Sequence, residues 1–104
     1  MKIISDNPEL LDAIHTKLKL ARIEVRKETK RVDGAMPGDV TTLVDVYNFI
    51  QEHHREITNY IRAVITLGNY LKSQIQVELK DGTVISFEEY ENMSEEDAQK
   101  AFVK

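Results

Sequence analysis

Histidines and acidic residues are the side chains of this chain best suited to chemistry. His53 and His54 are adjacent, and Glu52 and Glu56 lie one helical turn apart beside them. A zinc site needs three or four converging ligands, commonly with two histidines four residues apart on a helix. Adjacent side chains on a helix point about 100° apart, so the two histidines cannot chelate one ion together. We therefore interpret the segment as a solvated polar band and expect no metal and no cofactor.

Other catalytic motifs are missing from the sequence. None of Ser5, Ser73, Ser86 and Ser94 stands in a Gly-x-Ser-x-Gly setting, and the chain has three histidines to serve a hydrolytic triad. There is no cysteine, which excludes disulfides and thiolate chemistry. There is also no phosphate loop and no dinucleotide-binding fingerprint. The sequence therefore predicts a protein that is not an enzyme.

Size and composition favour a small globular protein. The 104 residues fit one domain, residues 1–104, with 41% hydrophobic and 31% charged residues. The net charge of −4 disfavours general binding to nucleic acid. No apolar run approaches 18 residues, and residues 1–20 lack the apolar core of a signal peptide. We expect a cytoplasmic protein that contacts neither nucleic acid nor membrane.

An unbroken heptad rhythm runs through residues 39–75, and it predicts one helix over residues 39–72. Such a helix of about 34 residues would be roughly 50 Å long, whereas a domain of this size has a radius of gyration of only about 13 Å. The helix must therefore protrude, pair with a partner or break. The positions that keep the rhythm are Val40, Leu43, Tyr47, Ile50, His54, Ile57, Ile61, Val64, Gly68, Leu71 and Ile75.

The two halves of this stretch are expected to differ. We expect residues 57–71 to pack on the protein's own sheet, and residues 40–50 to face a partner. His54 lies on the seam, where it could fix register, act as a pH switch, or lie at the edge with its tip in water. The candidate partner-binding residues are Val40, Leu43, Val44, Tyr47, Ile50, His54, Glu95 and Glu96.

The remaining elements complete a β-α-β-α-β-β-α order. Asn7-Pro8-Glu9 starts a helix, residues 22–29 read as a strand, residues 33–38 are the clearest loop with Asp39 capping the helix that follows, and Ser94 caps a last helix. Residues 75–87 form a hairpin, for which a three-residue turn would place Val77 opposite Ile85. We expect an α+β fold, with a small curled sheet, helices on one face, and the long helix extending past it.

This layout resembles the effector-associated constant component family of bacterial conflict systems. Asn7-Pro8-Glu9-Leu10 is similar to the family's Asp-Pro-Glu-Leu segment, and the 34–38 loop to its pre-helix loop. Tyr70-Leu71-Lys72 stands where the family usually has Trp-Leu-Arg, and residues 77–82 match its hairpin. The central helix is more polar here than in the family. The resemblance implies a non-catalytic adaptor beside a variable effector such as a protease or NTPase.

Charge is unevenly distributed along the chain. Residues 17–31 carry seven basic and two acidic residues, whereas residues 88–97 carry six acidic residues and no basic one. The two stretches could meet in head-to-tail assembly or partner docking, or could be solvated faces of one subunit. We therefore expect an adaptor that homo-oligomerises or docks an effector protein through its helix. The alternative is a small inhibitor or immunity-type protein that sequesters an enzyme through its acidic edge.

Overall fold

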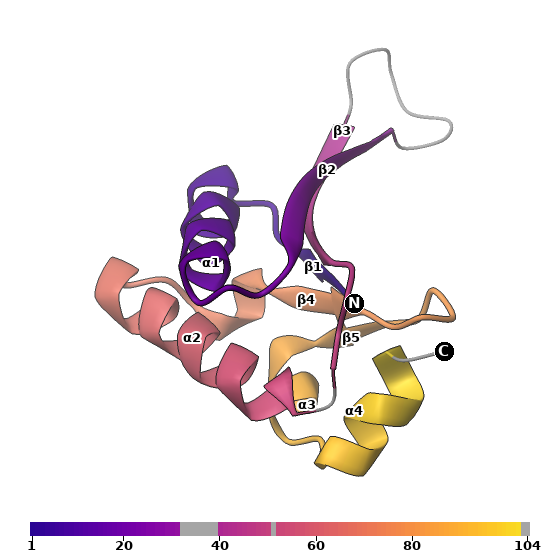
Figure 1. Ribbon diagram of the computed structural model, residues 1–104. Coiled ribbons are helices and arrows are strands. Elements are labelled where there is room, and N and C mark those ends of the chain that lie inside the picture. The colour runs from indigo at the N-terminus through magenta and orange to yellow at the C-terminus, as the bar shows by residue number, and fades with distance from the viewer. Residues whose placement is uncertain (32–39, 51, 103–104) are drawn as a thin grey trace.

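The computed structural model describes residues 1–31, 40–50 and 52–102, and it confirms an α+β fold (Figure 1). The elements in chain order are β1 (Lys2–Ile4), α1 (Pro8–Leu20), β2 (Val25–Arg31), β3 (Val40–Val46), α2 (His53–Gly68), the 3₁₀ turn η1 (Lys72–Gln74), β4 (Gln76–Glu78), β5 (Val84–Ser86), α3 (Phe87–Glu91) and α4 (Glu95–Phe102).

The five strands form one antiparallel sheet in the order β2-β3-β1-β4-β5. β1 is the central strand, with Ile3 opposite Val44 of β3 on one side and Val77 of β4 on the other. These three residues are fully buried and belong to the hydrophobic core, together with residues of α1 and α2. Because side chains alternate across a strand, the residues between them face away from the helices.

The core lies between this face of the sheet and the helices (Figure 1). α1 and α2 pack side by side, and α3 and α4 close the end near β4 and β5 with three aromatic side chains. Those rings are in mutual contact, with centroids 6.0 Å apart for Phe87 and Tyr90 and 5.6 Å apart for Tyr90 and Phe102. Their contacts place the short C-terminal helices firmly on the core.

Two helix starts are as predicted. The Asn7 side chain accepts hydrogen bonds from the backbone amides of Glu9 (3.1 Å) and Leu10 (3.4 Å), and Pro8 opens α1. The Ser94 hydroxyl accepts a hydrogen bond from the Asp97 amide at 3.1 Å, directly before α4. Both side chains satisfy amides that a helix leaves without partners in its first turn.

The prediction of one long helix over residues 39–72 is wrong, because residues 40–46 form strand β3. Five of these seven residues are valine or threonine. Such β-branched side chains are stiff and fit the pleated surface of a sheet better than a helix. β3 pairs with β2 along its whole length and with β1 over Leu43–Asp45. The three-four spacing of its apolar residues is therefore a coincidence, and it does not report a helical seam.

The helical part of the heptad stretch begins at His53 and ends at Gly68. Ile57, Ile61 and Val64 face the core, as predicted for this half. Asn69 ends the helix in the left-handed conformation, with φ 56° and ψ 40°. The Tyr70 amide then donates to the Ile65 carbonyl at 3.0 Å, the bond that defines a Schellman-type end. Leu71 is consequently exposed, contrary to the prediction that the helix extends past it.

The C-terminal hairpin has the predicted register. Val77 lies opposite Ile85, and the Leu79 amide donates a 2.7 Å hydrogen bond to the Thr83 carbonyl around a three-residue turn. Gly82 has a φ angle of 92°, a backbone conformation that residues with a side chain rarely adopt. α3 is an addition that the sequence analysis did not include, and Ser86 caps it by accepting from the Glu89 amide at 3.1 Å. The predicted 33–38 loop and the Asp39 cap lie outside the described residues.

Candidate functional site

The residues predicted to bind a partner do not share one surface. Leu43, Val44 and His54 are buried, with 2%, 0% and 4% of their surface exposed, so they are unavailable to a partner in this fold. Val40 lies in β3, at the end of the β2–β3 pairing. These three residues are buried because they do not lie on one long exposed helix. Leu43 and Val44 belong to the sheet, and His54 belongs to the first turn of α2.

Four of the predicted residues do reach the surface. Tyr47 and Ile50, in the connection between β3 and α2, are 51% and 43% exposed. Glu95 and Glu96, in the first turn of α4, are also exposed. Between Tyr47 and Ile50, Phe49 is buried and its ring lies 5.2 Å from the ring of Phe102 at the end of α4. This contact holds the β3–α2 connection beside α4.

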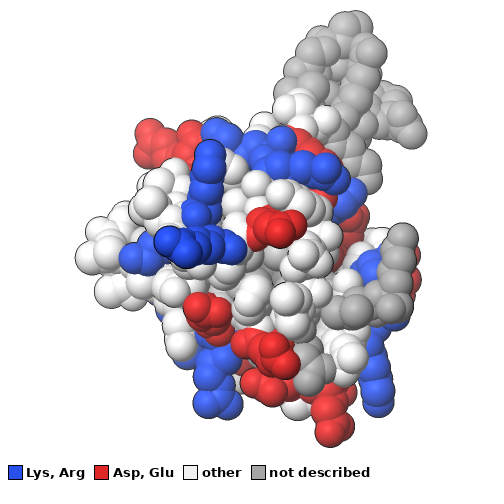
Figure 2. Space-filling model, viewed as in Figure 1, with Lys and Arg blue, Asp and Glu red and all other residues white. Residues whose placement is uncertain are grey.

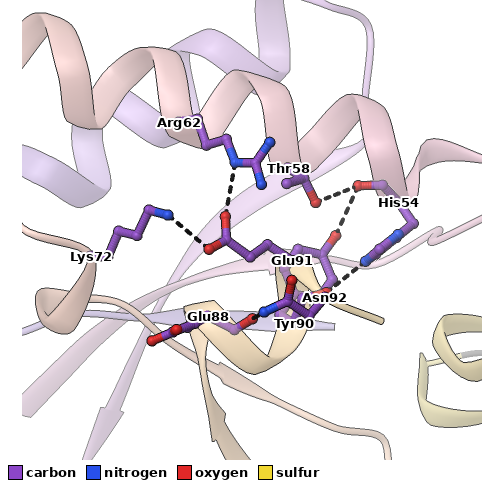
Figure 3. Close-up of polar contacts among 8 residues, drawn as sticks. All are labelled: His54, Thr58, Arg62, Lys72, Glu88, Tyr90, Glu91 and Asn92. Carbon is purple, nitrogen blue, oxygen red and sulfur yellow. Dashed lines mark hydrogen bonds and ion pairs between the residues drawn. The ribbon is translucent and has the colours of Figure 1, made fainter. Parts of the chain in front are cut away.

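His54 is a core residue and not a seam or solvent-edge residue. Its Nε2 atom lies 2.7 Å from the Tyr90 carbonyl oxygen, to which it donates, and the two rings make an edge-to-face contact at 4.7 Å (Figure 3). The His54 carbonyl accepts from the Thr58 hydroxyl at 2.8 Å and from the Tyr90 hydroxyl at 3.5 Å. Burial raises the pKa of the Tyr90 hydroxyl, which stays neutral. These contacts join α2 to α3.

A buried carboxylate adds a second junction between the same helices. The Glu91 side chain is 5% exposed and accepts from Arg62 Nε and from Lys72 Nζ, both at 2.8 Å (Figure 3). Burial by itself would raise the pKa of this carboxyl. The hydrogen bonds and charges of Lys72 and Arg62 outweigh burial and lower the pKa below its ordinary value of 4.5. Glu91 therefore holds α3 to α2 and η1 as an ion.

Sequence reasoning missed this junction, although one signal pointed to the helix that carries it. Ser86 followed by Glu89 is a capping-box spacing, and it marks the start of α3. The partners of Glu91 could not be chosen in the same way, since Arg62 and Lys72 are 29 and 19 residues away in the chain. Only the packing of α2, η1 and α3 selects them.

The described surface includes a larger and a smaller cleft. One of about 680 Å³ lies at the start of α1 and is lined by residues such as Ser5, Asp6, Thr42 and Gln74. Among its described lining residues Asp6 alone is ionisable, so these residues offer hydrogen bonds without a pair for acid-base chemistry. The other, of about 320 Å³, lies beside α2 and is lined by Arg55, Arg62 and Glu95 among others.

Basic and acidic side chains are both present on the face of the molecule drawn in Figure 2. Figure 2 shows basic side chains across the upper part of this view, near β2, and acidic side chains with some basic ones below. Two residues of the basic stretch are paired within the chain, because Arg26 contacts Glu28 and Asp45, and Lys27 contacts Asp12. The exposed Glu95 and Glu96 make no ion pair with a described residue.

Neither a metal centre nor a membrane-spanning helix occurs in the described parts of the chain. Within residues 1–31, 40–50 and 52–102, no three histidine, cysteine or acidic side chains gather closely enough to hold a metal ion. In the same ranges, no helix has the length and apolar character needed to cross a bilayer. The Nδ1 atom of His53 is buried without a hydrogen-bond partner among these residues. No protein-family model, curated protein or solved structure matches the chain.

Proposed function

We propose that the protein is a non-enzymatic interaction module that docks an effector protein, as the resemblance to the conflict-system family implies. The observation that carries the proposal is the surface of the β3–α2 connection. Tyr47 and Ile50 expose about half of their side chains there, on a connection that the Phe49–Phe102 contact holds against the core. Exposed aromatic and aliphatic side chains on a rigid support are typical anchors of protein interfaces.

The surroundings of these two residues fit the rim of an interface. The β3–α2 connection leads into α2, whose first turns line the smaller cleft together with Ser94 and Glu95 of the α4 start. Interfaces commonly combine an apolar centre with a polar rim that steers the partner and fixes its orientation. We call Tyr47, Ile50, Glu95 and Glu96 the docking surface. It keeps four of the eight residues that the sequence predicted.

The test is binding of an effector by the intact chain. The resemblance implies a protease or NTPase effector, so the probe is a purified protein of that kind encoded by an adjacent gene, and calorimetry measures its affinity. Changing Tyr47→Ser together with Ile50→Ser should weaken binding at least tenfold, because both anchors are removed. The matched control is Leu67→Ser, since Leu67 is 84% exposed at the far end of α2. Equal binding by the double variant and the wild type would contradict the proposed surface.

The second candidate is a small inhibitor that sequesters an enzyme through its acidic edge. The acidic side chains of α3 and α4 favour it, since Glu88, Glu95 and Glu96 are exposed and make no ion pair with a described residue. An inhibitor would abolish the activity of its enzyme at equimolar concentration, and Glu95→Lys with Glu96→Lys would relieve that inhibition. An adaptor would bind the effector and leave its active site working.

A further inference from the structure

The face of the sheet opposite the helices carries a row of alternating charges. In the strand register Arg26 of β2 lies opposite Asp45 of β3, Asp45 opposite Lys2 of β1, and Lys2 opposite Glu78 of β4. These residues alternate with Ile3, Val44 and Val77 of the core, so they share the helix-free face. Across the strands their signs read plus, minus, plus, minus. We call these four residues the charge row.

The row is ordered within the chain and partly open to solvent. Arg26 Nη2 lies 3.1 Å from Asp45 Oδ2, and Lys2 Nζ lies 3.9 Å from Glu78 Oε2. The basic side chains remain accessible, with 59% of Arg26 and 37% of Lys2 exposed. The acidic members lie deeper, with 10% of the Asp45 side chain and 18% of the Glu78 side chain exposed, so a neighbour would reach them mainly through its own long basic side chains.

Exposed apolar side chains stand at both ends of the row. At the β2 end, the Arg26 guanidinium lies 5.1 Å from the centre of the Tyr47 ring. At the other end, Val84 of β5 is paired with Glu78 and is 45% exposed. The sequence of chemical types across the face is thus apolar, plus, minus, plus, minus, apolar.

We propose that this face binds the same face of a second copy of the chain, about a two-fold axis through the middle of the row. A two-fold rotation reverses the order of the row on the partner, so each charge meets the opposite sign. Arg26 faces Glu78 of the other copy, and Asp45 faces Lys2 of the other copy. Val84 then approaches Tyr47 across the interface. Such a self-complementary patch is what an isologous dimer requires.

The dimensions of the face set the strength of this association. With strands about 4.8 Å apart, the four charges span roughly 14 Å. Stable interfaces bury about 800 Å² on each partner, which is more than a patch of this width offers. The charges also have partners within the chain already, so the gain on pairing is small. The dimer is therefore weak, reversible and sensitive to salt, because exposed charge pairs are screened.

This pairing goes beyond the proposed function, and its charged residues are separate from the docking surface. None of the four residues of the charge row belongs to the docking surface, although Tyr47 of the docking surface lies at the Arg26 end of the row. Variants of the row leave Ile50, Glu95 and Glu96 in place. A failure of self-association with effector binding intact would overturn only this inference, and the reverse result would overturn only the proposed function.

The experiment exchanges charges within each ion pair of the row. The first variant is Lys2→Glu with Glu78→Lys, and the second is Arg26→Asp with Asp45→Arg. Each exchange keeps the net charge of −4 and an opposite-sign pair at the same two positions. About the two-fold axis, however, each variant meets its own copy with like charges at every position of the row. Both should lose self-association, with a dissociation constant at least tenfold above that of the wild type.

A mixture of the two variants tests the proposed pairing most directly. In a mixed pair about the same axis, every charge of one variant meets the opposite charge of the other. The mixture should therefore associate although neither variant does so alone, as measured by sedimentation velocity at low salt. The matched control is Glu9→Lys with Lys19→Glu, which exchanges two exposed charges on α1 and should leave self-association unchanged. Self-association of either variant at wild-type strength would overturn the proposal.

A measurement on the unaltered chain covers the case in which an exchange variant does not fold. Backbone amide NMR shifts of the wild type are followed from micromolar to millimolar concentration. The proposal expects concentration-dependent shifts in β1, β4 and the Asp45 region of β3, and constant shifts in α1. Constant shifts throughout, or shifts confined to the helices, would overturn it.

Discussion

The two faces of the sheet are built from alternate residues of the same strands, yet one is apolar and buried and the other is charged. On one face Ile3, Val44 and Val77 are fully buried against the helices. On the other, Lys2 forms an ion pair with Glu78, and Arg26 forms one with Asp45. Burial of an aliphatic side chain contributes about 1.5–3 kcal/mol, whereas an exposed ion pair contributes about 0–1 kcal/mol. The covered face thus stabilises the fold, whereas the ion pairs of the other face contribute little to its stability.

The largest expected effect is on the covered face. Changing Ile3→Ala should lower the free energy of unfolding by about 2–5 kcal/mol, because it opens a cavity among residues that cannot collapse fully into it. The matched control is Ile4→Ala, since Ile4 is the next residue of β1, points to the other face and is only half-buried. Urea denaturation of both variants measures the difference. Equal losses would break the contrast between the faces.

The polar junction between α2 and α3 should have an intermediate effect. Changing Glu91→Ala removes two charge-assisted hydrogen bonds and should lower the unfolding free energy by about 1–3 kcal/mol. Arg62 and Lys72 are about half exposed, so water can solvate them afterwards and limit the loss. Glu88→Ala, on the exposed side of α3, should change stability by less than about 0.5 kcal/mol. If the two variants are equally stable, the junction is not a stabilising contact.

The same junction predicts a pH dependence. The pKa of Glu91 is lowered in the folded chain, so the unfolded chain binds its proton more readily. Its contribution is therefore complete above the ordinary value of 4.5 and is lost as pH falls through the folded value. The stability difference between the wild type and Glu91→Ala should be constant from pH 7 to about 6 and shrink below pH 4.5. A difference that persists unchanged at pH 3 would argue against an ionised Glu91.

The smallest effect on stability is expected on the charged face. The Arg26 side chain is 59% exposed, so changing Arg26→Ala, which removes its contacts to Glu28 and to the buried Asp45, should lower the unfolding free energy by about 1 kcal/mol. The same change should weaken self-association clearly, since Arg26 ends the charge row. Thermal unfolding and sedimentation on one sample compare the two quantities. A large stability loss with unchanged association would reverse the roles assigned to the faces.

The sequence predicted those parts of the fold that local chemistry determines. Asn7, Ser94 and Gly82 act at helix starts and in a turn through hydrogen bonds or backbone conformation within a few residues. The register that pairs Val77 with Ile85 follows from keeping apolar side chains on one face. Such features depend on residues close together in the sequence, which is why they can be predicted without knowing distant contacts.

β3 could not be recognised from the spacing of apolar residues, because both of its faces are buried. Val44 and Val46 lie in the core, while Leu43 and Asp45 are buried on the other face. A strand covered on both faces lacks the alternation of apolar and polar residues, and a short apolar run then fits a helix equally well. The run of valine and threonine was the better signal.

The candidate partner-binding residues were chosen on the assumption that residues 40–46 are helical, so only some of them lie at the surface. Tyr47 and Ile50 remain exposed because they lie in the connection after the strand, whereas His54 is buried by α3, a helix that the sequence analysis did not foresee. The charge row was also beyond reach. Its four members come from strands β2, β3, β1 and β4, and the sheet order that brings them together is not the order of the chain.

The most direct test of the account is the mass of the wild-type chain in solution as a function of concentration. Light scattering at low salt should give 12.0 kDa at low micromolar concentration, rising towards twice that mass near millimolar concentration and falling back when salt is added. A mass that stays at 12.0 kDa over the whole range would contradict a recognition role of the charged face towards a second copy.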